Sequence, residues 1–122
     1  MTEQEIKDGN KLIAEFMGAR LTLRNNELAV YLSENAVHAE YFRVTQYNKY
    51  HSSWDALMPV VEKIESLPKI NAAVDINKNV VIVSIEDGVI LFHGNVFLDN
   101  NKKINTVFLA VVSFVKWYNE NK

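Results

Sequence analysis

The stretch 71–93, NAAVDINKNVVIVSIEDGVILFH, decides the fold because its apolar residues follow a period of two. This alternation, broken by turn-forming residues, predicts three strands at residues 71–76, 80–85 and 89–93. Asp87 and Gly88 both tolerate the positive φ angles of a type I′ turn, so they predict a tight hairpin between the last two strands. The stretch is therefore predicted to be a three-stranded antiparallel meander with residues 80–85 in the centre.

Upstream of the meander, the N-terminal segment has the pattern of a helix. Thr2 and Glu5 have the spacing of a capping box. Gly18 is expected to end the helix, since glycine adopts the left-handed conformation at low cost. The apolar stripe that this helix would bury consists of Ile6, Ile13, Phe16 and Met17.

Two further helices are predicted around the meander. Ser52 and Asp55 fit the N-cap and N3 positions of the second helix, and Pro59 inside it removes one backbone hydrogen bond. Its apolar face is predicted to consist of Trp54, Leu57, Met58, Val61 and Ile64. The last helix has N-cap candidates at residues 99–101, followed by the apolar stripe Ile104, Val107, Phe108, Val111, Phe114, Val115 and Tyr118.

Between the first two helices, residues 19–50 have the weakest pattern. Alternation at 28–32 and again at 41–47 favours a hairpin there. The whole chain, residues 1–122, is therefore expected to be one α+β domain. Its antiparallel sheet would have three to five strands, with three helices packed mainly on one face.

Composition excludes several classes of protein. The chain has no cysteine, so it has no disulfide, thiolate metal site or cysteine nucleophile. Its net charge of −2 and its scattered bases make nucleic acid an unlikely partner, although a basic face formed only in the folded chain stays an alternative. The longest apolar run, 107–112, is too short for a membrane span, and the acidic N-terminus is unlike a signal peptide. We expect a cytoplasmic protein.

Three segments carry a resemblance to known sequences: GNKLIAEFMG at 9–18, YHSSWDALMPVVEKIE at 50–65 and AVVSFVKWYNE at 110–120. Together they resemble a family of small uncharacterised proteins of bacteriophages, prophages and gut Bacteroides-type bacteria. The resemblance implies a phage-related origin. It implies no activity and carries over no functional residue.

The candidate binding residues are the tyrosines around the weakly patterned segment and the polar residues that follow it, namely Tyr41, Tyr47, Tyr50, His51 and Asp55. Tyrosine is enriched at protein interfaces, and a histidine four residues from an aspartate can act as an oriented general base. In the structural interpretation, which we favour, Asp55 caps the helix, Trp54 anchors the core and His51 lies on the surface. His93 has no partner at the spacing of metal ligands, so neither a metal nor another cofactor is expected.

The meander raises one further expectation. If all helices pack on one face, then Val80, Ile82, Ile90 or Phe92 is left partly uncovered, and either residues 19–50 or a second subunit must cover them. The favoured function is a non-catalytic protein-interaction module with an unknown protein partner, able to form a homodimer through the uncovered face. The alternatives are a small enzyme that uses His51 and Asp55, or a weak nucleic-acid-binding protein.

Overall fold

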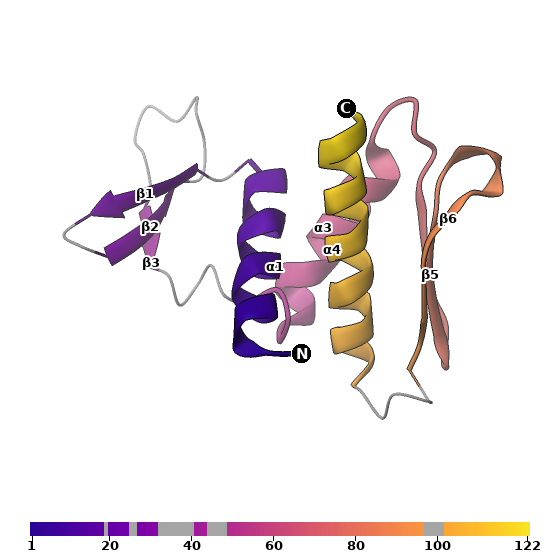
Figure 1. Cartoon of the computed structure of the whole chain (residues 1–122), viewed down its shortest axis with the longest axis horizontal. Coiled ribbons are helices and arrows are strands. Elements are labelled where there is room, and N and C mark those ends of the chain that lie inside the picture. Colours follow the sequence, from indigo (N-terminus) through magenta and orange to yellow (C-terminus); the bar gives the residue numbers. More distant parts are fainter. Residues whose placement is uncertain (19, 25–26, 32–40, 44–48, 97–101) are drawn as a thin grey trace.

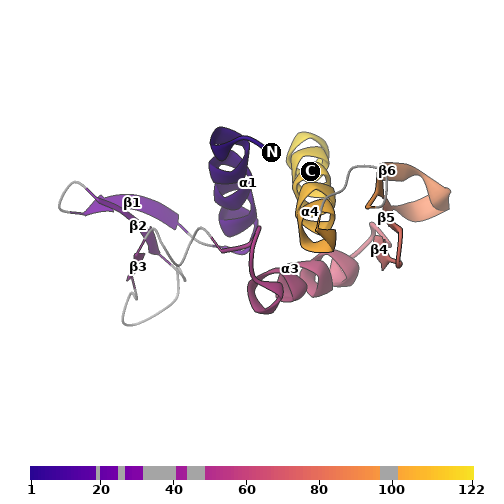
Figure 2. The same ribbon diagram turned by 90° about the horizontal axis from the view of Figure 1, so that it is seen from below.

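The computed structural model of the chain describes residues 1–18, 20–24, 27–31, 41–43, 49–96 and 102–122. Within these ranges it contains three α-helices and two three-stranded antiparallel sheets (Figure 1). The predicted α+β class is confirmed. All three helices lie on one side of the second sheet, as Figure 2 shows.

The second sheet is the predicted meander. It consists of β4 (Ala73–Ile76), β5 (Val80–Ser84) and β6 (Ile90–Asn95), in the order β4-β5-β6. The strands are antiparallel and β5 is central, as predicted for residues 80–85. Val81 and Val83 of β5 are fully buried.

The hairpin between β5 and β6 has the predicted residues in the predicted conformation. Asp87 and Gly88 have φ angles of 66° and 75°. The turn is longer than the predicted two residues, because η1 (Glu86–Gly88) fills it and the Ile85 amide donates to the Val89 carbonyl at 2.9 Å. The register shifts between Val83 and Ser84, and such a bulge accommodates the extra residue.

Helix α1 (Glu3–Phe16) begins and ends as its sequence predicted. The Thr2 hydroxyl accepts a hydrogen bond from the Glu5 amide at 3.1 Å and donates to the Glu5 carboxylate at 3.3 Å. Gly18, with φ of 92°, lies two residues past the end of the helix. The capping pattern and the terminating glycine are thus both confirmed.

Helix α3 (Trp54–Ser66) differs from the prediction at its start. The cap is Ser53, whose hydroxyl accepts from the Ala56 amide at 3.3 Å, so Ser52 and Asp55 are not the N-cap and N3 residues. The buried face also differs from the predicted one. Val60 joins it, while Trp54 and Met58 are 39% and 37% exposed and do not anchor the core.

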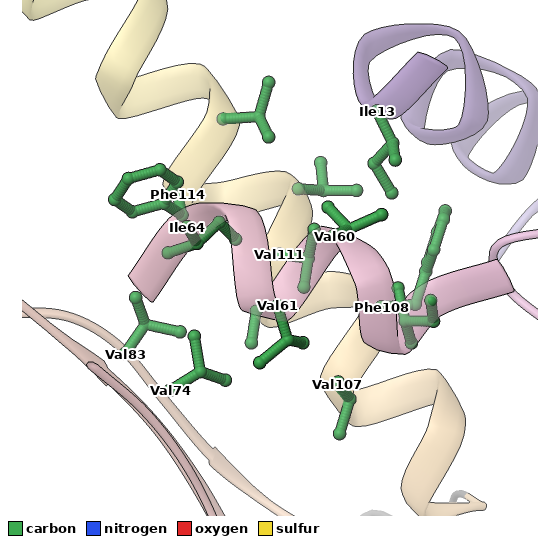
Figure 3. Packing of buried hydrophobic residues seen from close by; sticks show 14 of the residues in the cluster. Ile13, Val60, Val61, Ile64, Val74, Val83, Val107, Phe108, Val111 and Phe114 are labelled. Atoms are coloured by element: carbon green, nitrogen blue, oxygen red, sulfur yellow. The ribbon is translucent and has the colours of Figure 1, made fainter. Parts of the chain in front are cut away.

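Helix α4 (Lys103–Asn121) is the central element of the core. It packs against α1, α3, β5 and β6, and Figure 2 shows it between α1 and the meander. Its predicted stripe is confirmed in the buried residues Val107, Phe108, Val111, Phe114 and Val115. Val74 and Val83 point from the sheet toward the helices (Figure 3). The cap predicted at 99–101 lies outside the described residues.

The first sheet contains the predicted hairpin and one additional strand. It has the order β1 (Arg20–Arg24), β2 (Glu27–Tyr31) and β3 (Tyr41–Arg43), and β2 pairs with β3 with Val30 opposite Phe42. Strand β1 was not predicted. Both views place this sheet beside α1, on the side away from the meander, so its strands do not cover the outer face of β4–β6 (Figures 1 and 2).

Candidate functional site

A buried asparagine organises the region that contains Tyr50 and His51. Asn10 lies on the face of α1 that packs into the core, and its exposed fraction is 0%. Its Nδ2 donates to the Ile6 carbonyl at 2.9 Å, and its Oδ1 accepts from the Tyr50 amide at 3.1 Å. Nδ2 also lies 3.1 Å from Nδ1 of His51. Asn10 thereby fastens the chain before α3 to the first helix.

This network selects one tautomer of His51. A backbone amide can only donate and a carbonyl can only accept, so Tyr50 and Ile6 together fix which end of the Asn10 amide is oxygen. The amide nitrogen therefore faces His51, and Nδ1 of His51 must accept. The neutral ring then carries its proton on Nε2.

The geometry does not favour His51 and Asp55 as a catalytic pair. His51 is half-buried, its Nδ1 faces Asn10, and its ring meets the Phe108 ring edge-on at 6.0 Å. Asp55 is an exposed residue in the first turn of α3. In the tautomer set by Asn10, the outer nitrogen of His51 is a donor and has no lone pair with which to take a proton from a substrate.

The predicted tyrosines and His93 have separate surroundings. Tyr50 is half-buried at the edge of the core, and burial raises the pKa of its hydroxyl. Tyr41 lies in β3 opposite Tyr31, and Tyr47 lies outside the described residues. His93 is exposed on β6. The structure thus brings Tyr50 and His51 together at Asn10, and it does not add His93 to them.

Sequence reasoning missed Lys63, which links α3 to α1. Its Nζ donates to the Phe16 carbonyl and lies 4.5 Å from the centroid of the Phe16 ring, and burial lowers its pKa. No basic residue occupies the last turn of α1, so Lys63 supplies the cation that the carbonyl end of a helix favours. Lys63 also lines a cavity of about 460 Å³ with Glu15, Phe16, Tyr118, Asn119 and Lys122. We interpret Lys63 as a structural cap.

Two exposed apolar surfaces stand out among the described residues. Trp54 and Met58 lie one turn apart on the outer side of α3, flanked by the exposed carboxylates of Asp55 and Glu62. Val89 and Ile90, which are 50% and 58% exposed, lie at the β5–β6 hairpin. Large apolar side chains gathered at the surface are typical of protein interfaces.

The described residues form neither a metal-binding cluster nor a membrane-spanning helix. No three of their His, Asp or Glu side chains gather as a metal ion would require, and none of their helices is long and apolar enough to cross a membrane. No protein-family model, curated protein or solved structure matches the chain.

Proposed function

We propose that the protein is a non-catalytic, cytoplasmic protein-interaction module that binds its partner through the outer side of α3. The observation that carries the proposal is the exposure of Trp54 and Met58 at i and i+4 of one helix, at 39% and 37%. Tryptophan and methionine are enriched at interfaces, and tryptophan often dominates binding energy. Exposing a large apolar side chain to water is unfavourable, so a tryptophan exposed on a helix favours a role in binding a partner.

The charges beside this surface specify the kind of partner. Asp55 and Glu62 are exposed on the same helix, so the apolar pair has an acidic rim. Complementary charge steers association, so the partner we propose presents an apolar pocket bordered by lysine or arginine. The same acidic rim argues against nucleic acid at this surface, because phosphate groups would be repelled.

Two other expectations belong to this proposal. The resemblance of residues 9–18, 50–65 and 110–120 to phage-related proteins favours a phage or prophage source, with a bacterial host protein or a phage protein as the partner. The homodimer expected from the uncovered sheet face is a second interaction of the same module. An enzyme using His51 and Asp55 is less well supported, since Asn10 already uses Nδ1 of His51.

The test is affinity capture from bacterial lysate with the immobilised protein, followed by mass spectrometry. A partner captured by the wild type should be retained at least about tenfold less by the Trp54→Ala/Met58→Ala variant, since truncating a hot-spot tryptophan costs about 2 kcal/mol or more. Val89→Ala removes a similarly exposed apolar side chain elsewhere and should capture as well as the wild type. Capture that never exceeds background, or that the double variant leaves unchanged, would overturn the proposal.

A further inference from the structure

The register of the meander sorts its side chains onto two faces. The rows Val74–Val83–Phe92 and Ile76–Val81–Gly94 face the helices, because Val74, Val81 and Val83 are buried in the core and a Cβ on Gly94 would meet Thr106 of α4. Side chains alternate along a strand, so the intervening residues point the other way. The register shift between Val83 and Ser84 interrupts this alternation on β6, so Ile90, which pairs with Ser84, points outward although it lies two residues before Phe92. Phe92 therefore lies on the covered face, which corrects the expectation that it is uncovered.

The outer face is formed by three rows of cross-strand partners. The rows are Ala73–Ser84–Ile90, Asp75–Ile82–His93 and Val80–Asn95. No described helix or strand lies over this face in either view (Figures 1 and 2). The middle row has an acid on one edge strand, isoleucine in the centre and histidine on the other edge strand. On the outer face the central strand β5 thus presents Val80, Ile82 and Ser84, and the middle row has an acidic group on one edge strand and a basic group on the other.

We propose that a second copy of this chain covers the outer face, with a two-fold axis parallel to β5 between the two sheets. This inference rests on the proposed function as an interaction module and names its second surface. Rotation about such an axis places β4 of one copy over β6 of the other. Asp75 then faces His93 of the second copy, and because the contact is isologous it occurs twice. Ile82 meets Ile82 of the second copy between the two pairs.

The other rows match under the same rotation. Ala73 faces Ile90 of the second copy, and Val80 faces its own equivalent, so these apolar residues meet apolar residues. Ser84 faces Ser84 of the second copy. Aligned sheets pack about 10 Å apart, which is about the combined reach of an aspartate and a histidine side chain. The exposed Ile90, at 58%, gains an apolar neighbour in this arrangement.

Charge distinguishes this axis from the other in-plane two-fold axis. An axis across the strands would place β4 over β4 and bring Asp75 against Asp75 of the second copy. Like charges facing each other oppose association, whereas an aspartate facing a histidine favours it. The order of Asp75, Ile82 and His93 across the sheet therefore selects the axis parallel to β5.

Sedimentation equilibrium of the full chain tests whether this face dimerises. The wild type should form dimers in a concentration-dependent manner, and Ile82→Lys should weaken dimerisation by at least about a hundredfold because it buries two ammonium groups against each other. Asn119→Lys introduces the same charge on an exposed residue of α4 and should dimerise like the wild type. A wild type that stays monomeric at millimolar concentration, or an Ile82→Lys variant that dimerises normally, would overturn the inference.

A charge exchange tests the axis. His93→Asp should weaken dimerisation at least about tenfold, since Asp75 would then face an aspartate twice. Adding Asp75→His to this variant exchanges the two groups and should restore dimerisation under the proposed axis. Failure of the exchange to rescue would overturn the axis. The variants at Asp75, Ile82 and His93 keep Trp54 and Met58. Loss of dimerisation and loss of partner capture through α3 can therefore be measured separately, and one proposal can fail while the other holds.

Discussion

The two faces of the β4–β6 sheet are built from alternate residues of the same strands but have different roles. Val83 is fully buried against the helices, while its neighbour Ile82 is only half-buried and points outward. Helices α3 and α4 contact this sheet from one side only. One strand, β5, therefore contributes to stability through one face and offers a surface through the other.

The largest effect is expected for a charge on the covered face. Val83→Lys should destabilise the protein by about 3 kcal/mol or more, because Val83 is fully buried in the hydrophobic cluster and burying a charge there is costly. Ile82→Lys, one residue away, should cost about 1 kcal/mol or less in the monomer. Urea unfolding followed by circular dichroism, at a concentration where the wild type is monomeric, measures both. Equal losses for the two variants would contradict the assignment of the faces.

A second prediction concerns Asn10, a polar residue that is buried among the helices because its hydrogen bonds are satisfied. Asn10→Ala should cost about 2–3 kcal/mol, since it leaves the Tyr50 amide without its acceptor and opens a small void. Asn119→Ala removes the same side chain from an exposed position on α4 and should change stability by about 0.5 kcal/mol or less. Denaturant unfolding compares them.

The nitrogen-15 chemical shifts of His51 provide an independent readout of the same network. In the wild type they should report a proton on Nε2, because Asn10 donates toward Nδ1. In Asn10→Ala the preference should be lost. A wild-type ring protonated on Nδ1 would contradict the hydrogen-bond assignment.

A smaller loss is expected where the covered face lacks room for a methyl group. A Cβ added to Gly94 would come within 2.6 Å of the Phe92 ring and 2.7 Å of Thr106 Cγ2. Gly94→Ala should therefore cost about 1–2 kcal/mol through overpacking. His93→Ala, the neighbouring change on the outer face, should stay within about 0.5 kcal/mol. Thermal unfolding of the pair is the measurement, and a neutral Gly94→Ala would show that α4 can move away from β6.

Local signals explain which parts of the fold were predictable. Asp87 adopts positive φ because its short polar side chain tolerates the left-handed region, and Gly88 does so because it has no Cβ. Thr2 caps α1 through an amide three residues away. The start of α3 was predicted one residue too early because both Ser52 and Ser53 can cap a helix. Trp54 was predicted in the core because it lies three residues before Leu57, but it is the first residue of the helix and is exposed. Strand β1 was not predicted, although its sequence RLTLR alternates polar and apolar residues as a strand does.

The candidate site was less predictable because its contacts join distant parts of the chain. Tyr50 and Asn10 are 40 residues apart, and Lys63 and Phe16 are 47 apart. No spacing rule connects such pairs. His51 was singled out for the carboxylate of Asp55 four residues later, whereas its partner is an amide on another helix. The outer face was predicted correctly for Val80, Ile82 and Ile90 but not for Phe92, because the register shift between Val83 and Ser84 interrupts the alternation on β6.

The position of α4 in the chain has a consequence for synthesis. Chains emerge from the ribosome N-terminus first, and α4 is made after every other described element that packs on it. Until Lys103 and the residues after it emerge, the apolar faces of α1, α3 and β5 have no common neighbour. The nascent chain therefore holds these faces without their shared neighbour until α4 appears.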